Sequence, residues 1–236
     1  MPNSVMLSKD THLKTRVITD RGSQYGEGVH IVPVLATELR SLVLDFPICL
    51  LKDGETGQFG LYAFLGFDAG ENLFLQGDKW TSSYVPLNVR RQPFMVGFSQ
   101  QEGETENAVV TIDMDSPRVQ EEAGEALFTE EGEPTQFLKD VEQLLSNMVA
   151  GSKATEVFIK SLIDHELVEP IKLNVTFNNG EEKSYDGMYT VNEEKLAKLD
   201  AGPLQELHAK GYLQASYHLL SSMGHIRKLI EYKNAL

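Results

Sequence analysis

Residues 171–191 read IKLNVTFNNGEEKSYDGMYTV, and this stretch carries the clearest structural signal of the chain. Polar and apolar side chains alternate on both sides of Asn179-Gly180, as they do in strands with one buried face. This residue pair is favoured in type I′ hairpin turns, because both residues can adopt a positive φ. The stretch therefore predicts an antiparallel hairpin late in the chain.

Further strands are expected in the first half of the chain. Apolar runs occupy residues 30–35, 47–53, 58–67 and 93–98, and the turn-rich sequence DGETG separates the second run from the third. Pro33 places the first of these strands at the edge of a sheet or at a strand start, because proline has no amide hydrogen to donate. The run at 58–67 is almost continuously apolar, which indicates a strand buried on both faces.

Helical spacing of apolar residues dominates the second half. Residues 135–149 and 153–167 both show it, and Gly151 is expected to interrupt the helix between them. Asn192 is a good N-cap for a helix beginning in EEKLAKL. Strands early and helices late predict an α+β protein. We expect a mainly antiparallel sheet, built from the N-terminal half plus the late hairpin and packed against C-terminal helices.

The domain organisation follows from shifts in composition. Residues 1–25 form a polar N-terminal segment, and residues 26–236 are expected to form a single α+β domain. Within that domain, residues 100–133 hold eleven acids and one basic residue, Arg118. This acid density favours a solvated, extended and partly irregular excursion. The stretch is also a candidate boundary between two halves.

The charge balance argues against several classes of partner. Thirty-five acids outweigh twenty-one lysines and arginines, which gives a formal net charge of −14. Such a protein repels phosphate backbones, so we expect neither nucleic-acid binding nor docking on an anionic membrane through a basic face. No stretch approaches the roughly 18 apolar residues of a membrane helix. Residues 1–20 lack the apolar core of a signal peptide, so a cytoplasmic location is expected.

Strong catalytic motifs are not found in the sequence. It has no G-x-S-x-G elbow, no phosphate-binding P-loop and no G-x-G-x-x-G after a strand. Cys49, the only cysteine, lies in the apolar run DFPICLL, which is typical of a small buried thiol. His218 and His225 would lie about 10 Å apart along a helix, too far to share one metal ion easily. We therefore expect neither a metal site nor a cofactor.

The densest group of unusual residues lies in WTSSYVPLNVRRQPFMVGF, residues 80–98, and in the turn before it. Here an acidic protein places adjacent arginines beside its only tryptophan. Arginine binds carboxylates and phosphates through a planar fork and stacks on aromatic rings. The predicted ligand-binding residues are Glu71, Asn72, Trp80, Tyr84, Arg90 and Arg91. The same group also fits a structural role, in which Trp80 adds to the core and a buried arginine pairs with an acid such as Glu71.

Several blocks, in order along the chain, resemble the bacterial SapC family. They are VPVLATEL, DFPICL, LGFDAGENLFL, WTSSYVPLNVRRQPF, and later YDGMYTVNEEKL followed by L-x-x-L-H-x-x-G. The resemblance covers most of the chain from residue 28 onward. The family's name associates it with surface layers, and relatives also carry the label of a peptide transport permease. A permease does not fit a chain in which no membrane helix is expected.

The resemblance also implies a kind of function. Relatives tend to occur beside flavin-dependent tryptophan-halogenase-like proteins, cupin-like hydroxylase relatives and outer-membrane receptors, and no established catalytic residues come with the family. We therefore expect a non-catalytic binding or accessory protein that presents a peptide or small anionic ligand to a halogenase-like or cupin-like modifying enzyme. Two alternatives are an enzyme of unrecognised type using Glu71 with Arg90 and Arg91, and a surface-layer structural protein with calcium bound in residues 100–133.

Overall fold

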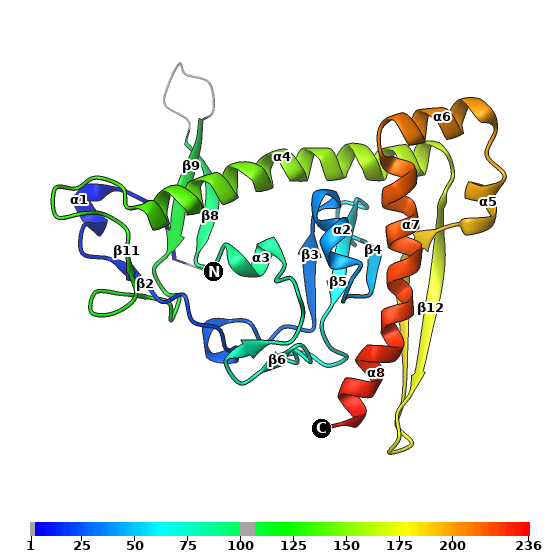
Figure 1. Cartoon of the computed structure of the whole chain (residues 1–236), viewed down its shortest axis with the longest axis horizontal. Helices are drawn as coiled ribbons and strands as arrows, with labels where there is room; N and C mark the ends of the chain where they lie inside the picture. The colour runs from blue at the N-terminus through cyan, green and yellow to red at the C-terminus, as the bar shows by residue number, and fades with distance from the viewer. Residues whose placement is uncertain (1–2, 100–106) are drawn as a thin grey trace. The chain divides into compact units, whose positions relative to one another are not determined.

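The computed structural model describes residues 3–99 and 107–236, and Figure 1 shows the chain coloured along its length. The described residues group into two compact units. Unit 1 comprises Met1–Gly28, Leu75–Lys79 and Leu87–Ala150, and unit 2 comprises Val29–Phe74, Trp80–Pro86 and Gly151–Leu236. A single domain over residues 26–236 stays a prediction.

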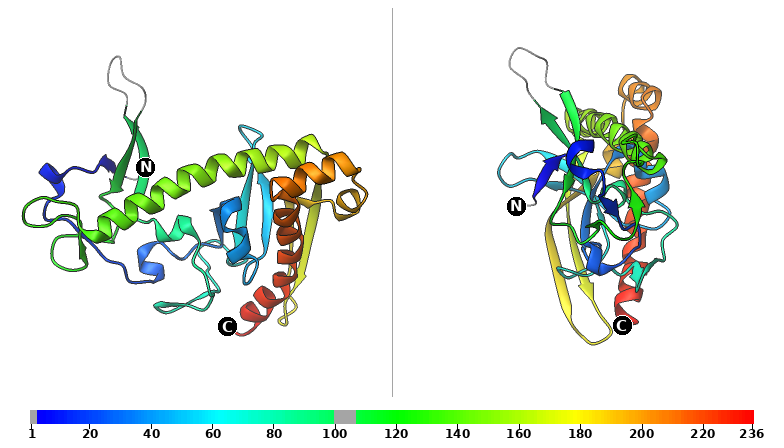
Figure 2. Two further views of the ribbon diagram at one scale, coloured as in Figure 1. Left: turned by 45° about the horizontal axis from the view of Figure 1, so that its top comes forward. Right: turned by 90° about the vertical axis from the view of Figure 1, so that its left-hand side faces the viewer.

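A five-stranded antiparallel sheet forms the centre of unit 2, with the strand order β12-β13-β4-β5-β3. The strands are β3 (Ile31–Val34), β4 (Ile48–Lys52), β5 (Phe59–Phe64), β12 (Val168–Thr176) and β13 (Glu182–Val191). Three strands come from the first half of the chain and two from the late hairpin, which runs as a long pair in both views of Figure 2. The predicted α+β class is confirmed. Pro33 lies in β3, an edge strand, as its missing amide hydrogen requires.

The hairpin is confirmed, but the predicted turn type is wrong. Gly180 has a φ of 86°, whereas Asn179 is not among the described residues with positive φ. The amide of Phe177 donates to the carbonyl of Glu181 at 2.9 Å, and the amide of Gly180 donates to the carbonyl of Phe177 at 3.0 Å. These bonds enclose a three-residue loop, and in such loops only the last residue needs the left-handed conformation.

Unit 2 also contains several helices, of which α7 packs against the sheet. Their bounds are η2 (Ala36–Glu38), α2 (Leu39–Leu42), α5 (Glu193–Ala197), α6 (Ala201–Ala209), α7 (Tyr212–Ser222), η3 (Met223–His225) and α8 (Ile226–Asn234). Helix α7 contacts β4, β13 and α2, and Leu219 on α7 is fully buried together with Leu50 on β4. The predicted N-cap is confirmed, because the side chain of Asn192 accepts a hydrogen bond from the amide of Lys195 at 2.8 Å.

Gly151 does not interrupt the helix, so that prediction is wrong. Helix α4 runs unbroken from Gln136 to Asp164. A Cβ atom at Gly151 would lie 2.8 Å from Cδ1 of Leu35 and 3.0 Å from Oγ1 of Thr37. One turn later, Oγ1 of Thr155 accepts the amide of Ala36 at 2.8 Å. The glycine therefore permits a close approach between α4 and the segment before α2, and this packing outweighs its low helix propensity.

Unit 1 contains two small sheets and the first half of α4. Strand orders are β1-β9-β8 and β10-β2-β11. Bounds are β1 (Ser4–Met6), α1 (Lys9–His12), β2 (Arg16–Val17), η1 (Ser23–Tyr25), β6 (Leu75–Gln76), α3 (Leu87–Arg90), β8 (Phe94–Ser99), β9 (Asn107–Asp113), β10 (Val119–Gln120) and β11 (Glu125–Ala126). Strand β7 (Lys79–Trp80), which pairs with β6, crosses from unit 1 into unit 2.

The core of unit 1 joins α4 to both small sheets. Phe94 of β8 lies opposite Ile112 of β9 in the strand register. Both side chains are buried in one cluster with Val17, Leu127 and Leu138. Part of the acid-rich stretch thus contributes buried residues to this core, while residues 100–106 of that stretch lie outside the described residues.

Candidate functional site

The six predicted ligand-binding residues fall in both units. Glu71, Asn72, Trp80 and Tyr84 belong to unit 2, whereas Arg90 and Arg91 belong to unit 1. These residues lie within 21 positions of one another in the sequence, but they belong to different units and have different neighbours.

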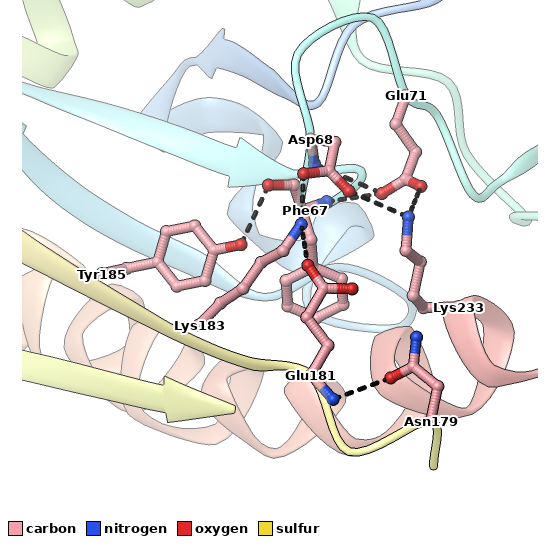
Figure 3. A network of polar contacts seen from close by, with 8 residues as sticks. All are labelled: Phe67, Asp68, Glu71, Asn179, Glu181, Lys183, Tyr185 and Lys233. Carbon is pink, nitrogen blue, oxygen red and sulfur yellow. Dashed lines mark hydrogen bonds and ion pairs between the residues drawn. The ribbon is translucent and has the colours of Figure 1, made fainter. Parts of the chain in front are cut away.

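Glu71 is part of an ion-pair network within unit 2 (Figure 3). One carboxylate oxygen lies 2.5 Å from Nζ of Lys233, and the other accepts the backbone amide of Phe67 at 2.7 Å. Lys233 also binds Asp68 at 2.9 Å, and Lys183 of β13 binds Asp68 as well. These bonds lower the pKa of Asp68 and raise that of Lys233. The network ties the loop after β5 to the hairpin and to helix α8.

The loop carrying Trp80 and Tyr84 is held by two acids of unit 2. The hydroxyl of Tyr84 donates to Glu38 at 3.1 Å, and the amide and hydroxyl of Ser83 donate to Asp45 at 2.8 and 2.5 Å. Lys228 on α8 pairs with Asp45 at 2.8 Å. Burial acts to raise the pKa of Asp45, but the bonds from Lys228 and Ser83 outweigh it, so that the pKa is lowered. Trp80 itself is half-buried.

Glu38 and Asp45 are both buried, and neither was among the predicted site residues. The sequence does contain an indication of their burial, because each is an acid inside an apolar segment, VPVLATEL for Glu38 and VLDFPICL for Asp45. Asn72 also has a local structural role, because its side-chain oxygen accepts the backbone amide of Phe74 at 3.1 Å.

Arg91 is fixed by hydrogen bonds within unit 1. Its Nε donates to Oδ1 of Asn88 at 2.9 Å, and its Nη1 donates to the carbonyl of Phe94 at 2.9 Å. Burial lowers the pKa of its guanidinium. Arg91 thus joins helix α3 to the first residue of β8, which is a structural role.

Arg90 has the opposite surroundings. It is the last residue of α3, its side chain is exposed, and within the described part of the chain that side chain has neither a hydrogen-bond nor an ion-pair partner. It lines a cavity of about 430 Å³ that lies wholly in unit 1. Arg21 and Arg118 line the same cavity.

Arg118 lines the cavity, although its side chain is almost completely buried. Its side chain is 3% exposed, and its Nη2 lies 2.6 Å from Oε1 of Glu27, which is 0% exposed. Its Nη1 donates to the carbonyls of Ile18 and Asp20 at 2.9 and 2.7 Å. The Nε atom is buried and has no hydrogen-bond partner among the described residues. Burial lowers the pKa of Arg118, while the charge of Glu27 opposes that shift.

A second arginine shares the same acid. Nη1 of Arg21 lies 2.8 Å from Oε1 of Glu27, and the ring of Tyr25 lies 4.9 Å from the guanidinium carbon of Arg118. This cluster was not found from the sequence. The sequence contains one indication of it, because Arg118 is the only basic residue in the acid-rich stretch, residues 100–133.

Comparison with known families identifies the chain. A family model described as SapC matches residues 7–229. The chain belongs to the SapC family. No curated protein and no solved structure matches it.

Other features of this SapC-family protein bear on the remaining predictions. Cys49 is fully buried in β4, and burial raises the pKa of its thiol to about 12, so the prediction of a small buried thiol is confirmed. Within residues 3–99 and 107–236, no helix is both long enough and apolar enough to cross a membrane. In the same residues, histidine, cysteine and acidic side chains form no group suited to holding a metal ion.

Proposed function

We propose that this SapC-family protein is a non-catalytic binding or accessory protein, whose anionic ligand binds in the arginine-lined cavity of unit 1. The observation that carries the proposal is the state of Arg90, a cation without a partner among the described residues at the wall of that cavity. A guanidinium in this position is ready to bind a carboxylate or a phosphate. The proposed ligand is thus a small anionic molecule or the anionic group of a peptide.

The size of the cavity also supports a ligand at this place. Its volume, about 430 Å³, falls within the range of small-molecule sites.

The surroundings of Glu71 favour binding over catalysis. A general acid or base must be within reach of the proton that it transfers. Glu71 instead engages Lys233 with one oxygen and backbone amides with the other, as structural carboxylates do. The accessory part of the proposal, presentation of the ligand to a halogenase-like or cupin-like enzyme, is supported by the neighbourhood in which SapC relatives tend to occur.

The test compares the small molecules that copurify with three forms of the protein. Wild type, Arg90→Gln and Arg227→Gln are purified from native lysate, and bound small molecules are identified by mass spectrometry. Arg227 is an exposed arginine on α8 in unit 2, so its replacement removes the same charge away from the cavity. We expect an anionic compound with wild type and Arg227→Gln that is lost with Arg90→Gln. An anion retained equally by Arg90→Gln, or no anion in any form, contradicts the proposal.

A further inference from the structure

The cavity of unit 1 has an apolar lining as well as a cationic one. Leu87, Phe137 and Leu144 line it together with the three arginines, and these three apolar side chains are only partly buried. Apolar walls gain free energy when a ligand displaces water from them, by about 25 cal/mol per Å² of apolar surface buried. A bare inorganic anion gains nothing from these walls. The ligand that fits the lining has an apolar body next to its charge.

The charges of the cavity nearly cancel. Arg21, Arg90 and Arg118 bring three positive charges, Asp140 also lines the cavity, and Glu27 pairs with two of the arginines. The lining and its direct ion-pair partner therefore carry one net positive charge. One negative charge neutralises this set. A second would be repelled by Asp140 and Glu27, and this repulsion is stronger in a partly enclosed site than in bulk water.

The hydrogen-bonding capacity points to the same class of ligand. Most donors of Arg118 are already used, on Ile18, Asp20 and Glu27, and only its Nε lacks an acceptor. That Nε is itself too deeply buried for a ligand atom to touch, so Arg118 contributes its charge to the site, and the exposed fork of Arg90 is a donor that a ligand can reach. On α4, the side chain of Gln143 donates to that of Asn147 at 2.9 Å, so this amide pair is partly satisfied as well. The two oxygens of a carboxylate match the planar fork of this single guanidinium.

We propose that the cavity of unit 1 selects amphiphilic monocarboxylates, that is, molecules with one carboxylate on an apolar chain or ring. This inference rests on the proposed binding function and narrows its ligand class. The carboxylate is held by Arg90, and the apolar body lies against Leu87 of α3 and against Phe137 and Leu144 of α4. Molecules with a phosphate dianion or a cationic head on the same apolar body bind more weakly.

The test uses three probes with the same eight-carbon chain: octanoate, octyl phosphate and octylamine. Binding to the full chain is titrated by ligand-observed NMR at pH 8, where octanoate carries one negative charge and octyl phosphate about two. We expect octanoate to bind about tenfold more tightly than octyl phosphate, and octylamine not to bind. Arg90→Gln should weaken octanoate binding about tenfold or more, because it removes a charge-assisted contact. Arg227→Gln should leave octanoate binding unchanged.

The contrary outcomes separate this inference from the proposed function. If octyl phosphate binds as tightly as octanoate and both depend on Arg90, the monocarboxylate class is overturned while anion binding stands. If octylamine or octanoate binds equally to wild type and Arg90→Gln, the cavity acts through its apolar walls alone, and the proposed anion site fails too. Circular dichroism and the melting temperature of each variant verify that it is folded, so that a loss of binding is not a loss of structure.

Discussion

Nη2 of Arg118 lies 2.6 Å from Oε1 of Glu27, and both side chains are almost completely buried in unit 1. Taking one partner from a buried pair leaves the other charge without compensation, which costs about 3–5 kcal/mol. Here the remaining charge would be that of Arg118, and Arg21 would also lose its acceptor. Glu27 is therefore expected to determine the stability of the cavity wall, although it does not line the cavity itself.

Replacement of Glu27 by Gln should therefore lower the free energy of unfolding by about 3 kcal/mol. Urea unfolding followed by circular dichroism measures this loss. Glu131→Gln serves as a control, because Glu131 is an exposed acid in the same unit and its charge is not buried. A Glu27→Gln protein as stable as the control would show that the buried pair contributes nothing to unit 1.

The two adjacent arginines should differ sharply in their effect on stability. Arg91→Ala removes hydrogen bonds to Asn88 and Phe94 and should cost about 1–3 kcal/mol. Arg90→Ala removes an exposed side chain and should change stability by less than about 0.5 kcal/mol. Thermal unfolding of the two single variants measures both effects. Equal melting temperatures for the two variants would contradict the structural role of Arg91.

This contrast shows which parts of the candidate site a sequence can predict. The spacing and composition of residues 80–98 indicated that arginines beside aromatic residues form an unusual group. Arg91 is held by hydrogen bonds to Asn88 and Phe94, whereas Arg90 is exposed. This difference depends on how α3 is oriented and on where β8 begins, and the two adjacent arginines do not reveal either. Arg118 joins Arg90 at the cavity across 28 positions of sequence, so local pattern could not connect them.

The same limit applies to the fold. Polar and apolar side chains alternate in residues 171–191, and this alternation predicted the hairpin. It could do so because the two faces of a strand are set by the order of residues within that strand. Residues 58–67 also contain a strand, β5 (Phe59–Phe64), and its signal was local as well, a nearly continuous run of apolar residues. Gly151 was misjudged because its effect comes from Leu35, more than a hundred positions away, against which only a residue without a side chain can pack so closely.

The pH dependence of stability should carry a contribution from Asp45. Its pKa in the folded protein lies below the ordinary value of 3.8, although burial opposes the shift. A lowered folded pKa stabilises the protein at pH values above the unfolded pKa, and this stabilisation is lost as the pH falls through the folded pKa. Asp45→Asn should therefore cost about 1–3 kcal/mol at pH 7 through its bonds to Lys228 and Ser83, and less near pH 3.

Urea unfolding of wild type and Asp45→Asn at pH 7 and pH 3 measures that difference. Asp164→Asn is a suitable control, because Asp164 pairs with Lys160 on the surface, where both side chains are more than half exposed. Such surface pairs contribute little to stability. A cost of Asp45→Asn that is the same at both pH values would show that the charge of Asp45 is not what holds Ser83 and Lys228.

Two glycines in helices of unit 2 should respond in opposite ways to replacement by alanine. In a helix, alanine is normally favoured over glycine by about 1 kcal/mol. Gly202 in α6 has no atom within 4 Å of the position its Cβ would take, so Gly202→Ala should be neutral or stabilising. At Gly151 the new methyl group would meet Leu35 and Thr37 at 2.8 and 3.0 Å, so Gly151→Ala should destabilise the protein by about 1–3 kcal/mol through overpacking. Thermal unfolding of the two variants measures the contrast. A stabilised Gly151→Ala protein would mean that α4 does not pack closely against the segment before α2.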